Sequence, residues 1–249
     1  MRAAVAVGAL AWAGAAVGDP APLAAPTLLP ERTAAAALAL EGRLDASYLD
    51  LAADGWYGLS PRLTVGLRTS WRGADTIGAG RGVCVRGCLA GDPRVRGLAL
   101  TARFPVVTGR TRVAGELATD VTGWSPAHAA VGLGAIADWG GGPVAVRASA
   151  RLAIGLLGRT DGNRDRARVD VAVVAPVMAP VAIEVGAGVT GPATDGFFAG
   201  ATAPAWLQLA VAPAPAAGVA WGVGLAIGTD DVVRGERTGY AALVVTARR

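Results

Sequence analysis

The chain has 249 residues, of which 53% are hydrophobic and 17% charged, with 36 glycines. Soluble domains carry about a quarter charged residues, so this composition disfavours an ordinary water-soluble surface. The formal net charge is +4, but every basic residue is arginine and none forms a dense run, which argues against nucleic acid as a partner. A high-GC codon bias that replaces lysine by arginine explains this pattern, and contact with anionic lipid head groups is the alternative.

The N-terminus has the pattern of a secretory signal peptide. Met1 and Arg2 give a positive start, residues 3–15 are continuously apolar, and small residues follow at 16–18. We predict a signal peptide over residues 1–18, with a short buried helix as the alternative. Residues 19–33 are Pro-rich and lack a period, which indicates an extended leader in the periplasm.

Beyond the leader, apolar residues recur at every second position. Leu63, Val65 and Leu67 alternate with Thr64, Gly66 and Arg68 in a segment that ends at Trp71. Period two is the period of a β-strand, because successive side chains point to opposite faces of a sheet. The same alternation predicts strands over residues 36–44, 48–59, 63–71, 98–104, 113–121, 131–139, 144–156, 168–173, 181–189, 198–211, 219–228 and 239–247.

The charged residues of these strands fall on the second, small-residue face. An apolar outer face and a polar inner face are what a barrel in lipid requires, so we expect this second face to line the interior. A paired charge ladder that fills the interior and a polar pore that selects solutes are both compatible with the pattern. The predicted pore-lining residues are Arg68, Arg103, Glu116, Asp120, Asp138, Arg147, Arg151, Arg168, Asp170 and Glu184.

One long uncharged stretch, residues 196–229, competes as a transmembrane helix. Pro204, Pro213 and Pro215 would break such a helix repeatedly, because proline removes a backbone donor and clashes with the preceding turn. We therefore expect two strands joined by a turn.

The two cysteines, Cys84 and Cys88, lie four residues apart in a Gly/Arg-rich loop. In an exported protein such a pair most simply forms a local disulfide, and with a single distant histidine it falls short of a metal site.

The connections between the predicted strands alternate in length. Short turns alternate with longer, more charged loops, which is the asymmetry of barrels whose short turns face the periplasm. About twelve strands (10–12) in an all-β, antiparallel, up-and-down transmembrane barrel satisfy the pattern, with both termini at the short-turn end. A soluble β-sandwich or lipocalin-like barrel is the alternative fold.

With these features the chain resembles small outer-membrane β-barrel proteins of Gram-negative bacteria, over residues 34–249. The resemblance implies the cell outer membrane as its location. It also implies membrane lipid, lipopolysaccharide and the barrel assembly machinery as partners, and a monomer or small oligomer. One departure is the C-terminus, which ends in Arg248 and Arg249 where such proteins usually carry an aromatic residue.

The function expected from this resemblance is a structural barrel or a narrow passive pore for small solutes, without a cofactor. The alternatives are a surface protein that binds lipopolysaccharide or a partner through its loops, and a lipid-modifying enzyme. Ser125 and His128 are the only residues that suggest catalysis, and no nucleophile-elbow pattern surrounds the serine. We therefore expect no enzymatic activity.

Overall fold

The computed structural model describes thirteen stretches of the chain. They are residues 26–44, 49–69, 82–88, 95, 97–124, 127–140, 144–160, 163–178, 180–193, 200–212, 218–229, 231–232 and 239–249. The predicted signal peptide, Trp71 and Ser125 lie outside them. Across these stretches, no helix is long and apolar enough to cross a membrane.

All strands formed by the described residues pair in the antiparallel direction. The strands are β1 (Ala34–Arg43), β2 (Leu49–Ser60), β3 (Leu63–Arg68), β4 (Val83–Arg86), β5 (Leu98–Val107), β6 (Thr111–Trp124), β7 (Ala127–Gly140), β8 (Ala145–Leu157), β9 (Arg166–Met178), β10 (Val181–Pro192), β11 (Ala205–Val211), β12 (Ala220–Thr229) and β13 (Gly239–Arg248).

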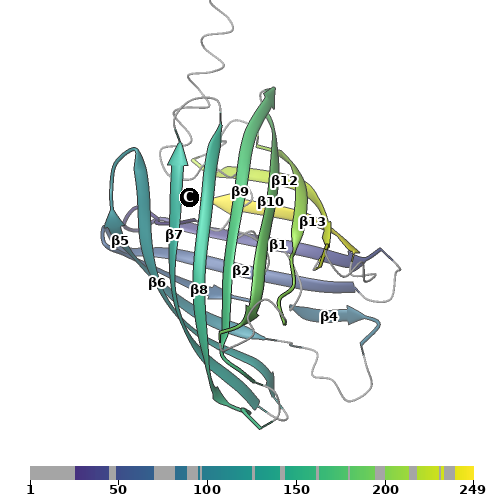
Figure 1. The fold of residues 1–249 in the computed structure, drawn as a ribbon. Helices are drawn as coiled ribbons and strands as arrows, with labels where there is room; N and C mark the ends of the chain where they lie inside the picture. The colour runs from purple at the N-terminus through teal and green to yellow at the C-terminus, as the bar shows by residue number, and fades with distance from the viewer. Residues whose placement is uncertain are drawn as a thin grey trace, which may run out of the picture.

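The strands close into a barrel (Figure 1). Apart from β4, each strand pairs with the next one along the chain, and β3 pairs with β5. β1 pairs with both β2 and β13, which joins the two ends of the sheet. β3 pairs with the second half of β2 and β4 with its start, so these two strands share one position in the wall. The result is a closed 12-strand up-and-down barrel, as the alternating pattern predicted.

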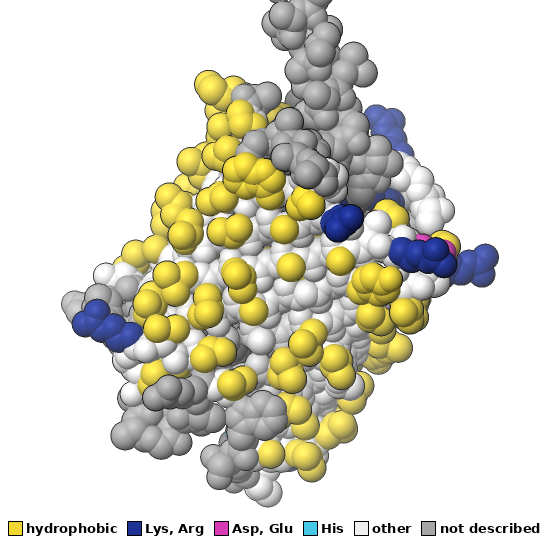
Figure 2. Space-filling view, turned by 180° about the vertical axis from the view of Figure 1, so that it is seen from behind, with side chains coloured by type: hydrophobic (Ala, Val, Ile, Leu, Met, Phe, Trp, Pro, Cys, Tyr) yellow, Lys and Arg dark blue, Asp and Glu magenta, His cyan; other side chains and the backbone are white. Residues whose placement is uncertain are grey.

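The exterior of the barrel is apolar. Large hydrophobic side chains such as Leu100, Leu133 and Leu225 are half-exposed or more. Figure 2 shows such side chains spread over the wall, with arginines at its margins. In a water-soluble barrel these faces would be reversed, so the charge-inside arrangement excludes the sandwich and lipocalin alternatives.

The two ends of the barrel differ. One end, here called the short-turn end, carries the connections at residues 61–62, 108–110, 141–144, 179–180 and 212–219. The other end carries the longer connections, apart from short ones at 44–48 and 125–126. Ala34 and Arg249 exchange backbone hydrogen bonds of 2.8 and 2.9 Å, so both ends of the barrel domain lie at the short-turn end, as expected.

The exposed aromatic side chains of the described strands sit near the short-turn end. Tyr57 and Phe104 precede short turns, Trp139 does the same on β7, and Trp221 follows one at the start of β12. Tryptophan and tyrosine favour the membrane–water interface because they combine an apolar ring with a polar group, and barrels carry girdles of aromatic residues there. Their position marks one edge of the apolar belt.

Most strand ends differ from the prediction by a few residues, and two differences are larger. The strand expected over 198–211 begins only at Ala205, because Pro204 has no N–H to continue the ladder, and just one isolated bridge, between Thr190 and Thr202, precedes it. The short strand β4 was not predicted at all. The two-strand interpretation of residues 196–229 is confirmed by β11 and β12, which pair directly.

Candidate functional site in the barrel interior

All ten residues predicted to line the pore lie on the inner face of the wall. Most of their side chains are buried, and those of Asp120, Arg151 and Arg168 are partly exposed. The alternation therefore predicted their face. It did not predict how they pair.

The centre of the charged wall is a ladder built on Glu116 of β6. Arg103 of β5 donates from Nε to Glu116 Oε2 at 2.8 Å. Arg151 of β8 donates from Nε to Oε1 at 2.6 Å and from Nη2 to Oε2 at 3.1 Å. One carboxylate thus binds two guanidinium groups from strands on either side of it.

Arg151 reaches Glu116 across the intervening strand β7, and Gly134 makes this possible. A Cβ atom at Gly134 would lie 2.9 Å from Arg151 Cγ and 3.0 Å from the carbonyl oxygen of Ala150. Any larger residue would push the arginine stem away from β7. The glycine is therefore part of the site, although it carries no functional group.

Three further ion pairs continue the charged wall. Arg147 donates to both oxygens of Asp138, at 2.7 and 3.1 Å. Arg168 Nε lies 2.7 Å from Asp170 Oδ2. Arg68 pairs with Asp54 at 3.4 Å, and its guanidinium carbon lies 5.7 Å from the centroid of the Trp56 ring.

The opposite side of the interior, formed mainly by β1, β2 and β11 to β13, carries an apolar cluster beside the buried polar side chains of Glu41, Asp50 and Gln208. Its buried cluster contains Ala35, Ala37, Ala39, Ala52, Trp56, Ala210, Ala226, Ala242 and Val244. On neighbouring β10 and β11, Trp206 covers Gly186, where a Cβ would lie 2.0 Å from the ring, and donates to Glu184 Oε1 at 2.8 Å. The interior thus has one side lined with ion pairs and one side that combines an apolar cluster with buried polar side chains.

The most unexpected component of the interior is a segment that no sequence pattern predicted. Within residues 26–30, from the predicted leader, Pro26, Thr27 and Leu29 are buried inside the barrel at the short-turn end. Thr27 and Leu29 are 1% and 3% exposed, and Leu29 belongs to the apolar cluster just described. The segment has no hydrophobic period, so only its proline content was visible in the sequence.

This segment forms hydrogen bonds with side chains of four strands, β3, β5, β7 and β8. Arg103 donates from Nη1 to the carbonyl oxygen of Pro26, and Thr27 donates from its hydroxyl to Asp138 Oδ2. Arg147 donates from Nη2 to Thr27 Oγ1 at 2.9 Å. The amide of Leu29 donates to Thr64 Oγ1 at 2.8 Å.

Glu41 and Gln208 are two further inner-wall residues, and neither was among the predicted pore-lining residues. Both side chains are buried and lie on the same side of the sheet as Glu184, and Gln208 pairs with Glu184 in register. The strand alternation could have identified them.

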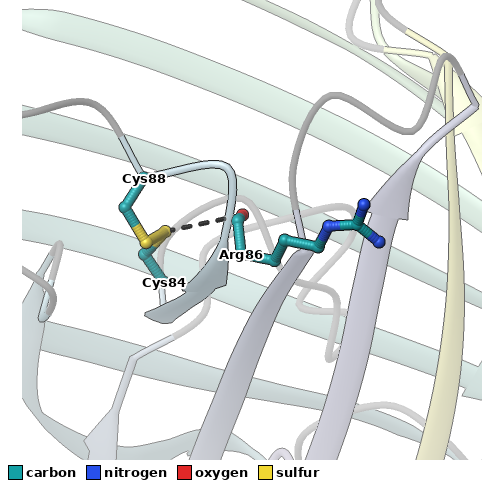
Figure 3. Close-up of a disulfide and its surroundings, with 3 residues drawn as sticks. All are labelled: Cys84, Arg86 and Cys88. Atoms are coloured by element: carbon teal, nitrogen blue, oxygen red, sulfur yellow. Dashed lines mark hydrogen bonds between the residues drawn. A yellow bond between two sulfur atoms is a disulfide. The ribbon is translucent and has the colours of Figure 1, made fainter.

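The predicted disulfide between Cys84 and Cys88 is present, with an S–S distance of 2.04 Å (Figure 3). The disulfide joins Cys84, within β4, to Cys88, which lies just after the end of β4. Cys84 Sγ lies 3.7 Å from the carbonyl oxygen of Arg86. β4 pairs with the start of β2, so the disulfide stiffens the long-loop end and takes no part in the charged ladder.

The loop between β8 and β9 is also held by an ion pair. Arg159 Nη1 lies 2.7 Å from Asp165 Oδ1, which also accepts a hydrogen bond from the amide of Gly155 at 3.0 Å. The hydrogen bond from Arg159, with that from Gly155, holds the pKa of Asp165 below its ordinary value. The side-chain amide of Asn163 donates to the carbonyl oxygens of Ala129 and Leu157 at 2.8 and 2.5 Å.

The proposed serine–histidine pair gains no support from the structure. Ser125 lies outside the described residues. His128 lies near the start of β7, and its Nε2 has no hydrogen-bond partner among the described residues.

Comparisons with known proteins show which solved structures share this fold. No protein-family model and no curated sequence matches the chain. Among solved structures, the NanC porin superimposes with a TM-score of 0.55 at 8% identity, covering 85% of this chain and 98% of the porin. The KdgM porin, determined in complex with disordered oligogalacturonate, superimposes with a TM-score of 0.51 at 7% identity, covering 86% and 97%. The fold is therefore that of small porins.

Proposed function

We propose that the protein is an outer-membrane barrel that forms a narrow passive pore for small solutes. One observation carries this proposal: the barrel buries ion pairs on its inner wall and exposes hydrophobic side chains on its outer wall. An apolar exterior is stable only where lipid replaces water, and a charged interior suits the passage of polar solutes. The similarity to porins supports the same assignment.

The solutes are proposed to pass along the charged side of the interior. Arg151 and Arg168 have side chains that are 20% exposed, so both can reach a solute while they remain bound to their carboxylates. Guanidinium groups bind oxyanions through paired N–H donors. Small carboxylated solutes are therefore the class to test first, in line with the oligogalacturonate bound to the KdgM porin.

Single-channel recording in planar lipid bilayers tests the pore. Folded protein is expected to give discrete openings that small ions cross. A parallel recording uses a chain that lacks residues 19–30, so that the segment inside the barrel cannot hide a channel. Folded, inserted protein without openings in either form would contradict the proposal and favour a surface protein that acts through its loops.

A further inference from the structure

We propose that residues 26–30 form an internal plug, which closes the pore at the short-turn end and occupies the hydrogen-bond donors that an oxygen-rich solute would use. This inference rests on the proposed pore. The plug is the Pro-Thr-Leu-Leu-Pro segment that precedes β1.

The plug matches both sides of the interior. Leu29 packs with the apolar cluster that includes Ala210, Ala226 and Val244. Thr27 and the carbonyl of Pro26 face the other way, toward Arg103 and the Arg147 pair. Because one short segment contacts both sides, it spans the interior rather than lying along one wall.

A tight turn directs the plug into the barrel. Arg32 has a positive φ of 61°, which reverses the chain just before β1. The amide of Arg32 donates to the carbonyl of Gly58 at 2.8 Å, and the amide of Gly58 donates to the carbonyl of Thr33 at 2.9 Å. A Cβ at Gly58 would lie 1.9 Å from the carbonyl oxygen of Pro30, so glycine is needed for this close approach.

The contacts of the plug are of a kind that a solute can replace. The segment carries no charged residue, so it forms no ion pair with the wall. Arg103 and Arg147 keep Glu116 and Asp138 as their partners and use one further N–H each to bind a plug oxygen. A carboxylate or hydroxyl oxygen of a solute can accept the same two hydrogen bonds, because both plug acceptors are also oxygens.

Displacement of the plug by a solute therefore exchanges the two hydrogen bonds that Arg103 and Arg147 donate, instead of losing them. A buried donor left without an acceptor is costly, and this cost keeps the plug in place while no solute is present. The expected result is a pore that opens more often when a suitable solute is available.

Two variants test the plug in planar bilayers. The first is the mature chain without residues 19–30, which is expected to show a several-fold higher open probability than the intact chain. The second is the Leu29→Cys/Thr64→Cys double variant, in which adjacent residues can be cross-linked. Oxidation of this variant is expected to abolish openings, and reduction is expected to restore them.

Two controls isolate the effect of the plug. The intact protein under the same reductant accounts for opening of the native Cys84–Cys88 disulfide, and the Leu29→Cys single variant accounts for the substitution itself. If both forms conduct and have the same open probability, the plug proposal is overturned, while the pore proposal stands. Absence of current in both forms overturns the pore, and the plug with it.

The shared donors are tested with D-galacturonate as the probe and D-galactose as its uncharged counterpart. If the plug occupies the arginine N–H groups that a solute would bind, galacturonate should block current at a several-fold lower concentration in the variant that lacks residues 19–30 than in the intact chain. Galactose should show a smaller difference. The same blocking concentration of galacturonate in both proteins would contradict a shared site.

Discussion

Glu116 is the residue on which the charged wall depends most, because it binds Arg103 and Arg151 at once. Removing one partner of a buried pair leaves the other charges desolvated without compensation. Glu116→Ala is therefore expected to lower the free energy of unfolding by about 3–5 kcal/mol, measured by urea denaturation in lipid vesicles.

The matched control for Glu116 is Glu31, a carboxylate at the rim that pairs with the exposed Arg32 at 3.6 Å. Exposed pairs contribute about 0–1 kcal/mol, so Glu31→Ala should leave stability nearly unchanged. Equal effects of the two substitutions would show that the ladder does not stabilise the wall.

Arg151 offers a test of permeation at the residue scale. Arg151→Gln removes a positive charge that is partly exposed to the interior, so it is expected to shift the reversal potential in a salt gradient toward cation permeability. Arg62→Gln, in an exposed turn at the barrel end, is the control and should shift it less. A reversal potential that Arg151→Gln leaves unchanged would place the ion path elsewhere.

At the scale of elements, the alternation predicted the strands and their faces because side-chain direction in a strand is set locally. Arg68, Arg147 and Glu184 were assigned to the inner face on that basis alone. The pairing of Arg151 with Glu116 was not predictable, because it depends on the register of three strands and on a glycine between them.

The elements that escaped prediction are those without a period. β4 has four residues, too few to establish alternation within a Gly/Arg-rich loop. Residues 26–30 are positioned by partners far away in the sequence: Arg103 lies 77 positions from Pro26 and Arg147 lies 120 from Thr27. Such contacts leave no local signal in the chain.

The loop between β8 and β9 should respond to acid. Because the pKa of Asp165 is lowered in the folded loop, its stabilising effect is present above the ordinary value of 3.8 and is lost as the pH falls below it. Asp165→Asn should therefore loosen the loop already at neutral pH, which limited tryptic cleavage after Arg159 or Arg164 would detect. Unchanged cleavage of the variant at neutral pH, with cleavage at Arg110 as the internal reference, would contradict this role.

At the scale of the whole molecule, the outer wall is the part that must meet lipid. Leu133 lies in the middle of β7 with its side chain half-exposed, between Leu117 and Leu152 on the neighbouring strands. Leu133→Arg is expected to reduce the stability of the lipid-inserted barrel by about 2–4 kcal/mol, measured by denaturant titration in vesicles. Leu133→Ala is the control, and an equal effect of both would argue against lipid at this position.

The central claim is that this chain folds as a barrel in the outer membrane, with its ion pairs inside. Heat-modifiable migration on a gel tests it most directly, in protein extracted from carbonate-washed outer membranes. A folded barrel is expected to give a compact, fast-migrating band without boiling that shifts to a slower band after boiling. Protein found in the soluble periplasmic fraction, migrating as one band under both conditions, would contradict it.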